Sequence, residues 1–319
     1  MNIISTIIVT YNRKNELLRC IQAVLRQTKK PTSLIIIDND SSDGSFEYIY
    51  AALFGDGVLS ITKGQLVEWS YDEINIYYKK MERNEGGAGG FYAGMEIADK
   101  ILKSDFFWLM DDDGYPSDDC LEKQLTLIAE YDYVMPVSID LDDNKKMSWA
   151  TKKRNGVKTI FYRELYESWG EIINYVIPFN GALLTRKCIE KVGYINKDFF
   201  IWGDDYEHYW RCKKAGFNPI TFMQAIFYHP AQRIALVPIF FNLYKLPYVE
   251  SKLRMICLIR NSTYIYLHYD KKTKIVLKFI MYSWLFLITR RFDINGYKLY
   301  LRSMADAFQN NFTRHREYL

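Results

Sequence analysis

Short apolar runs that end in polar or glycine-containing turns alternate with amphipathic stretches along roughly the first 230 residues. The runs are too short for helices and are rich in β-branched and aromatic residues, so they predict buried strands. These strands cover residues 3–10, 34–37, 74–78, 106–110 and 133–137. Helices are expected between them, through residues 17–25, 46–50, 95–101 and 118–130. The alternation predicts an α/β fold, a Rossmann-like, mostly parallel sheet with helices on both faces.

The remaining segments carry weaker patterns. Residues 51–73 are expected to be irregular and peripheral, and residues 140–175 to form an aperiodic insertion over the active edge. Further strands are predicted at 182–184, 220–222 and 225–228, and further helices through 189–192 and 206–216. Residues 233–319 form a C-terminal region that is helical in pattern, basic and aromatic.

The net charge of +4 hides an asymmetry. Residues 233–319 hold 15 Lys+Arg and 5 Asp+Glu, a net of +10, whereas residues 1–232 hold 27 and 33, a net of −6. Charge alone therefore predicts a domain boundary near residue 232. Five cysteines without CxxC spacing favour a reducing compartment over a disulfide framework or a zinc site. We see no signal peptide and no run of 18 uncharged apolar residues, so no spanning helix is expected.

Three consecutive carboxylates, Asp111 to Asp113, follow directly on the apolar run 106–110. Gly114 and Pro116 end the run in a turn, so the carboxylates lie at the carboxyl end of a strand, where open α/β sheets bind ligands. Adjacent anions repel one another, so such a cluster usually holds a cation, and hard oxygen ligands suit Mg²⁺ or Mn²⁺. The alternative is a solvated acidic turn.

Three other sequence features are candidates for a functional role, and each also has a purely structural interpretation. The glycines at 86, 87, 89 and 90 allow the backbone to approach a ligand closely, and the following helix N-terminus favours an anion, although a flexible turn has the same composition. One of Asp204 and Asp205 is a candidate general base, but both also suit a helix N-terminus. His229 is expected at a strand end, where it is either a ligand or structural.

Five pieces of sequence occur in a fixed order: VTYNR at 9–13, IDNDSSDG at 37–44, NEGGAGGF at 84–91, MDDD at 110–113 and WGDDYE at 202–207. The ordered set resembles the inverting family 2 glycosyltransferases of GT-A fold. Within that family it is most similar to the bacterial galactofuranosyltransferases. The resemblance covers about residues 3–230. One departure is Gly203, which separates Trp202 from the acid pair where an adjacent Trp is expected.

The resemblance implies a role for each matching residue. The nucleotide-sugar half is expected at about 1–115 and the acceptor half at about 116–232. Donor binding would fall to Thr10, Arg13, Asp38, Asn84, Gly87 and Asp112. Metal binding, of Mn²⁺ or Mg²⁺, would fall to Asp111, Asp113 and His229. On the acceptor side Asp205 would be the catalytic base, Asp204 the fallback base, and Trp202 would stack on a sugar.

The basic C-terminal region adds an expectation about partners. Its most apolar piece, 275–289, is 15 residues long, contains Lys278 and is flanked by further Lys and Arg. It fits a helix lying in a membrane interface, and the alternative is a core helix packed on the catalytic domain or on a dimer partner. No nucleic-acid motif accompanies the positive charge, so a nucleic-acid partner is not expected. A lipid-linked glycan acceptor would explain a membrane-facing region, and we therefore expect the protein in the cytoplasm, at the inner face of the cell membrane.

The donor class is expected to be UDP-galactofuranose, with dTDP-rhamnose second; the glycine segment and His229 favour the first. A second class is nucleotidyl transfer to a sugar phosphate, but that chemistry usually needs a basic glycine-rich loop after the first strand, and VTYNR is not one. A third class is a non-catalytic nucleotide-sugar binding module. The presence of both acidic clusters and His229 speaks against it.

Overall fold

The computed structural model describes residues 2–55, 60–176, 180–231 and 234–319. The chain forms two compact units. The first, called here the sheet unit, consists of Met1–Lys197 and Arg211–Gln232, and the second, the helical unit, of Asp198–Trp210 and Arg233–Leu319. Residues 198–210 therefore belong to the same compact unit as the C-terminal region. The predicted boundary near residue 232 between a catalytic domain and a C-terminal region stays a prediction.

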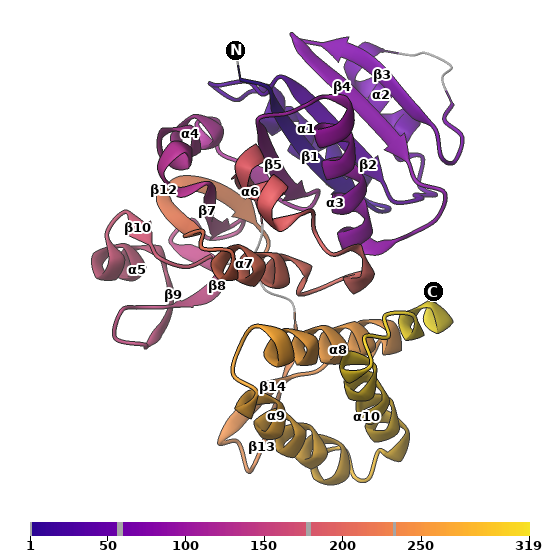
Figure 1. Ribbon diagram of the computed structural model, residues 1–319, viewed down its shortest axis with the longest axis vertical. Helices are drawn as coiled ribbons and strands as arrows, with labels where there is room; N and C mark the ends of the chain where they lie inside the picture. Colours follow the sequence, from indigo (N-terminus) through magenta and orange to yellow (C-terminus); the bar gives the residue numbers. More distant parts are fainter. Residues whose placement is uncertain (1, 56–59, 177–179, 232–233) are drawn as a thin grey trace. The chain divides into compact units, whose positions relative to one another are not determined.

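The sheet unit is built on a long mixed sheet (Figure 1). Strands β5, β1, β2 and β4 are mutually parallel, and β12 is parallel to β7. The antiparallel β11 joins these two groups. In spatial order the strands are β10 (Ile172–Ile173), β12 (Ile220–His229), β7 (Tyr133–Asp140), β11 (Ala182–Thr185), β5 (Phe106–Asp111), β1 (Ile4–Thr10), β2 (Ser33–Asp38), β4 (Ile74–Lys80) and β3 (Leu66–Tyr71).

Helices cover both faces of this sheet, as expected. The side chains of β1 alternate, so Ile4 and Ile8 pack in one core cluster with Leu17 and Ile21 of a helix on that face. The opposite face meets another helix through the side chains of Ile7 and Val9. The helices of this unit are α1 (Lys14–Leu25), α2 (Ser45–Phe54), α3 (Gly86–Glu96) with a π-helical extension to Ile101, α4 (Cys120–Tyr131), α5 (Tyr162–Trp169), α6 (Arg186–Val192) and the second part of α7 (Asp204–Lys214).

The structure corrects four local expectations. The segment 51–73 is not irregular throughout, because β3 pairs along β4 and its Trp69 packs on Tyr78 at a ring distance of 6.4 Å. The insertion 140–175 contains two strands, a helix and a short edge strand: β8 (Lys146–Lys152), β9 (Lys158–Phe161), α5 and β10. The two strands expected at 220–222 and 225–228 are one bulged strand, β12. Finally, Gly86 to Gly90 are helical and do not form a loop.

The glycines of α3 are needed for close packing on β1. A Cβ on Gly94 would lie 2.4 Å from Ile7 Cγ2, and one on Gly90 would lie 2.4 Å from Val9 Cγ1. A Cβ on Gly87, at the start of the same helix, would meet nothing within 4 Å. Gly90 and Gly94 therefore serve helix–sheet contact, whereas Gly87 combines open space with a helix N-terminus.

We predict opposite stability effects for two substitutions in α3. Gly94→Ala is expected to lower the free energy of unfolding by about 1–3 kcal/mol, because the new methyl group overlaps Ile7. Gly87→Ala is expected to leave it unchanged or raise it by up to about 1 kcal/mol through helix propensity. Urea denaturation of both variants measures this difference. Equal stability of Gly94→Ala and the wild type would contradict the packing.

The helical unit packs three helices and a hairpin around one apolar cluster. Its elements are β13 (Leu236–Ile239), β14 (Tyr244–Pro247), α8 (Lys252–His268), α9 (Thr273–Trp284) with a π-helical extension η3 (Leu285–Thr289), α10 (Ile294–Phe308) and the 3₁₀ turn η4 (Arg314–Tyr318). The apolar segment 275–289 is split between environments: Tyr282, Leu285 and Phe286 are buried in the cluster, whereas Leu277 and Ile280 are exposed. None of the helices in the described ranges has the length and apolar character needed to cross a membrane.

Candidate active site

Parallel pairing brings three polar strand ends to one edge of the sheet. Val9 on β1 is in register with Asp111 at the end of β5, and Thr10 is in register with Asp38 at the end of β2. Because neighbouring parallel strands end on the same side, the turns after β1, β2 and β5 share that edge. On the other half of the sheet, β12 ends at His229.

The carboxylate cluster is held by residues of the first turn. Thr10 Oγ1 donates to Asp112 Oδ2 at 2.7 Å, and Arg13 Nη1 lies 3.1 Å from Asp112 Oδ1 and 2.9 Å from Asp113 Oδ2. Asp112 is only 3% exposed. This burial raises the pKa of Asp112 to about 6, although Arg13 and Thr10 act to lower it. Arg13 is therefore the protein's own countercharge for the cluster.

Asp113 also meets His229. The two side chains approach to 3.3 Å between Asp113 Oδ1 and His229 Nε2. His229 Nδ1 lies 2.6 Å from the carbonyl oxygen of Pro230, and since a carbonyl only accepts, Nδ1 carries the hydrogen. His229 Nε2 thus faces Asp113 Oδ1, a carboxylate oxygen that is buried. Such a pair needs a proton or a cation between its members.

The residues present therefore fit a divalent cation in part. Burial acts to raise the pKa of Asp113, but His229 and Arg13 outweigh it, and the pKa lies below its ordinary value. A carboxylate that stays ionised beside an imidazole nitrogen supplies two ligand groups that can bind Mn²⁺. Within the described ranges, however, no group of three or more His, Cys, Asp or Glu side chains is arranged to hold a metal. Asp111 would have to complete the set.

Two of the remaining predicted donor residues, Asp38 and Asn84, form hydrogen bonds at the ends of β2 and β4. Asp38, 1% exposed, accepts from Tyr78 Oη at 2.9 Å and from the backbone N–H of Ser41 at 2.7 Å. Asn84 Oδ1 accepts from the N–H of Gly86 at 2.8 Å, at the start of α3. Asp38 and Asn84 thus shape the turns after β2 and β4, and Gly87 leaves open space beside the second turn.

Two residues of this site escaped prediction. Trp149 of β8 stacks on the His229 ring, with 4.6 Å between centroids, and so fixes the plane of the imidazole. Asn180 Oδ1 accepts from the N–H of Asp111 at 3.1 Å and positions the end of β5. Trp149 lies in a segment without periodicity, and Asn180-Gly181 has only the composition of a turn, so no sequence signal marked either one.

The acid pair lies in the helical unit, at the start of α7. Asp204 is 8% exposed. This burial, together with the weaker effect of the negative charge of Asp205, raises the pKa of Asp204 to about 8. Asp204 is consequently protonated at neutral pH, whereas Asp205 is partly exposed and accepts from the N–H of Tyr206 at 2.6 Å. When one acid of a close pair is neutral, the other can remain ionised. The two carboxyl groups therefore differ in burial: Asp204 is buried and Asp205 is partly exposed.

The loop before α7 is held by two buried residues of α8. Trp202 has φ +64°, which is uncommon for a bulky residue. The side-chain amide nitrogen of Asn261 lies 3.0, 3.0 and 2.8 Å from the carbonyl oxygens of Phe199, Ile201 and Trp202. Arg260 donates to Phe199 O at 3.0 Å and to Asn261 Oδ1 at 2.9 Å. The C-terminal region therefore positions the backbone that leads to the acid pair.

His315 completes this network and predicts a pH effect. Its Nδ1 accepts from Arg260 Nη1 at 3.0 Å. Burial, aided by Arg260, lowers the pKa of His315 to about 4. The unfolded chain, with a pKa near 6.5, then binds more protons between pH 6.5 and 4, so stability is complete above that range and falls with pH through it. We expect a loss of about 2 kcal/mol between pH 7.5 and 5.

Urea denaturation at several pH values measures this loss. His315→Gln offers a matched control because glutamine keeps an acceptor for Arg260 but does not titrate. Its stability is expected to change less over the same range. Parallel pH profiles for the wild type and His315→Gln would refute the assignment to His315.

A parallel sheet with polar turns and carboxylates at the carboxyl ends of its strands is typical of α/β enzymes that bind nucleotides. Residues 5–193 match the family model "Glycosyl transferase family 2", and the chain belongs to this family. It is 26% identical to galactofuranosyltransferase GlfT1 of Mycolicibacterium smegmatis over 98% of each chain. It is 28% identical to galactofuranosyltransferase GlfT1 of Mycobacterium tuberculosis over 89% of each chain.

Solved structures agree on the fold. S. aureus TarS matches 86% of this chain with a TM-score of 0.50 and 13% identity. The mannosyltransferase PcManGT from Pyrobaculum calidifontis, in complex with GDP-Man and Mn²⁺, matches 82% with the same score and identity. The match covers 41% and 61% of those chains, less than two thirds of either one. The expected family and GT-A architecture are thus confirmed, and the protein is a glycosyltransferase.

Proposed function

We propose that this enzyme is a metal-dependent, inverting galactofuranosyltransferase. Its donor is UDP-galactofuranose, and its acceptor is a hydroxyl of a growing, lipid-linked cell-surface glycan. The observation that carries the proposal is the likeness to GlfT1 over 98% of each chain, because it extends through the helical unit with Asp205 as well as the sheet unit. No comparable observation favours dTDP-rhamnose or nucleotidyl transfer.

The proposed roles divide between the carboxylate cluster with His229 in the sheet unit and the acid pair in the helical unit. Asp111, Asp113 and His229 would hold Mn²⁺ or Mg²⁺, and such a cation would supply charge stabilisation for the diphosphate leaving group. Thr10 and Arg13 hold Asp112, which is directed to the ribose or sugar of the donor. Ionised Asp205 takes the proton of the acceptor hydroxyl, as a general base must.

A donor screen tests this proposal. The full-length enzyme is incubated with Mn²⁺, a panel of octyl glycoside acceptors and either UDP-galactofuranose or dTDP-rhamnose. We expect release of UDP to exceed release of dTDP at least tenfold, loss of transfer in EDTA, and an inverted anomeric centre in the product by NMR. Preference for dTDP-rhamnose, or full activity in EDTA, would overturn the corresponding part of the proposal.

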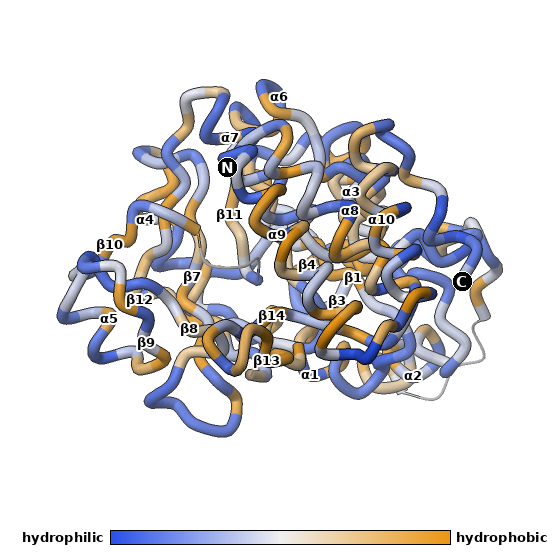
Figure 2. The backbone as a smooth tube through the Cα atoms, turned by 90° about the horizontal axis from the view of Figure 1, so that it is seen from below, coloured by the Kyte–Doolittle hydropathy of each residue, from blue (hydrophilic) through white to orange (hydrophobic). Residues whose placement is uncertain are grey.

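We further propose that the helical unit contacts an anionic membrane. Phe241, at the turn between β13 and β14, is 87% exposed, and Leu277 on α9 is 58% exposed. Figure 2 shows hydrophobic positions along α9 and along the hairpin. Exposed aromatic and aliphatic side chains flanked by basic residues are typical of interfacial binding. The flanking cations are Lys245, Lys271, Lys272, Arg290 and Arg291.

Vesicle flotation tests this contact, and we expect the double variant Phe241→Ser with Leu277→Ser to bind at least about tenfold more weakly. Val157→Ser, which removes an exposed apolar residue of the sheet unit, is the control. Point variants are preferable to a deletion of 233–319, because Arg260 and Asn261 hold the loop before α7. Unchanged flotation of the double variant would contradict the proposal.

A further inference from the structure

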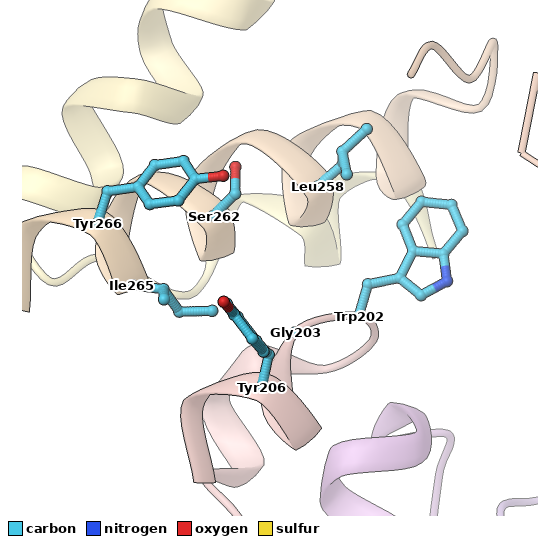
Figure 3. A pocket seen from close by; sticks show the side chains of 7 residues that line it. All are labelled: Trp202, Gly203, Tyr206, Leu258, Ser262, Ile265 and Tyr266. Atoms are coloured by element: carbon cyan, nitrogen blue, oxygen red, sulfur yellow. The ribbon is translucent and has the colours of Figure 1, made fainter. Parts of the chain in front are cut away.

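A pocket of about 120 Å³ lies within the helical unit, between the loop before α7 and helix α8 (Figure 3). The indole of Trp202 and the ring of Tyr266 lie at opposite ends of it. Its lining residues are Trp202, Gly203, Tyr206, Leu258, Ser262, Ile265 and Tyr266. Gly203 and Tyr206 flank the acid pair Asp204-Asp205 in sequence, so the pocket shares its backbone with the proposed base.

The lining is apolar and offers few partners to a sugar. Its side-chain polar groups are three hydroxyls and the indole N–H of Trp202, and the hydroxyl of Ser262 already donates to the carbonyl of Ile259 at 3.2 Å. A sugar bound there would leave several of its own hydroxyls without partners, which costs free energy for each one. Aromatic rings and branched aliphatic side chains instead favour a hydrocarbon.

The aromatic rings at the two ends of the pocket, those of Trp202 and Tyr266, each lie against a cation. Arg254 lies over the Trp202 ring at 5.9 Å, and Lys278 lies over the Tyr266 ring at 4.9 Å from the centroid. Burial, with a smaller contribution from Lys274, lowers the pKa of Lys278 to about 8. Lys274 is paired with Asp270. An apolar pocket whose end rings each carry a cation is complementary to a hydrocarbon chain joined to an anionic group.

We infer that this pocket binds the hydrocarbon chain of an amphiphilic acceptor and that the anionic group joined to the chain lies beside Lys278. The inference rests on the proposed function in one respect, since it makes the pocket part of the acceptor site. The apolar surface of the hairpin and α9 belongs to the same unit, which suits a ligand drawn from a membrane.

Isothermal titration calorimetry with octyl phosphate, below its micelle concentration, tests the pocket without any transfer reaction. We expect Ser262→Phe, which fills the pocket, to weaken binding at least about tenfold, the loss of roughly two buried methylenes. Ser262→Ala keeps the pocket open and should bind within about twofold of the wild type. Lys278→Gln is expected to weaken octyl phosphate binding about threefold or more, and inorganic phosphate alone should not bind measurably.

Two further measurements separate the alternatives. Leu277→Ser, on the exposed face of α9, should leave octyl phosphate binding unchanged; a loss there would assign binding to the membrane-facing surface and overturn the pocket. Equal affinity of Ser262→Phe and the wild type would also overturn it. The calorimetry contains no nucleotide-sugar donor. Failure of UDP-galactofuranose in the donor screen would therefore refute the proposed function but would not affect the measured binding of octyl phosphate.

Discussion

Asp205→Asn is expected to lower turnover by about 10²–10⁴-fold, the usual contribution of a general base, while the affinity for UDP-galactofuranose stays unchanged. Asparagine matches the shape of the aspartate side chain but cannot accept the hydroxyl proton. The measurement is the initial rate of transfer at saturating donor, with donor affinity determined separately by calorimetry.

Asp204→Asn is the matched control for this variant. Because burial already keeps Asp204 protonated at neutral pH, an amide changes its charge little, and turnover should fall less than about tenfold. A normal rate for Asp205→Asn would refute its role. A larger loss for Asp204→Asn than for Asp205→Asn would make Asp204 the base.

Asn261→Leu is expected to be the most damaging substitution away from the acid pair. Leucine preserves the size of the side chain but removes the donors that serve the carbonyls of Phe199, Ile201 and Trp202. The carbonyls of Ile201 and Trp202 lose this donor, whereas that of Phe199 keeps Arg260. A carbonyl left without a partner costs about 1–3 kcal/mol, so we expect the free energy of unfolding to fall by at least about 2 kcal/mol. The left-handed backbone at Trp202 then loses its support, and turnover should fall with it.

Urea denaturation and transfer assays below the unfolding transition separate these two effects. Ser262→Ala, at the next position of α8, is the control and should change stability by less than about 0.5 kcal/mol. Wild-type stability of Asn261→Leu would show that the loop before α7 does not depend on α8. Full turnover in the folded fraction would show that the loop does not position Asp205.

The sheet was predictable because its signal is local. The β-branched run at 3–10 and the apolar run at 106–110 can only be buried strands, and parallel pairing follows from the helices between them. The same reasoning placed Asp111 at a strand end. The sequence pattern did not predict β3 and β8. Their residues are partly exposed, so their sequences resemble polar loops, and they form strands because they pair with a neighbouring strand. The glycines of α3 also suggested a loop, although Gly90 and Gly94 serve contact with β1.

The α/β fold, the family resemblance and the candidate acidic residues could all be predicted from the sequence, because periodicity and short motifs depend only on neighbours along the chain. How those residues are held became visible in the folded protein. Arg13 reaches the carboxylates from 99 positions away, and Asn261 reaches the loop before α7 from about 60 positions away. Such hydrogen bonds depend on directions that exist only after folding. For the same reason burial alone distinguished Asp204 from Asp205, two residues that the sequence leaves equivalent.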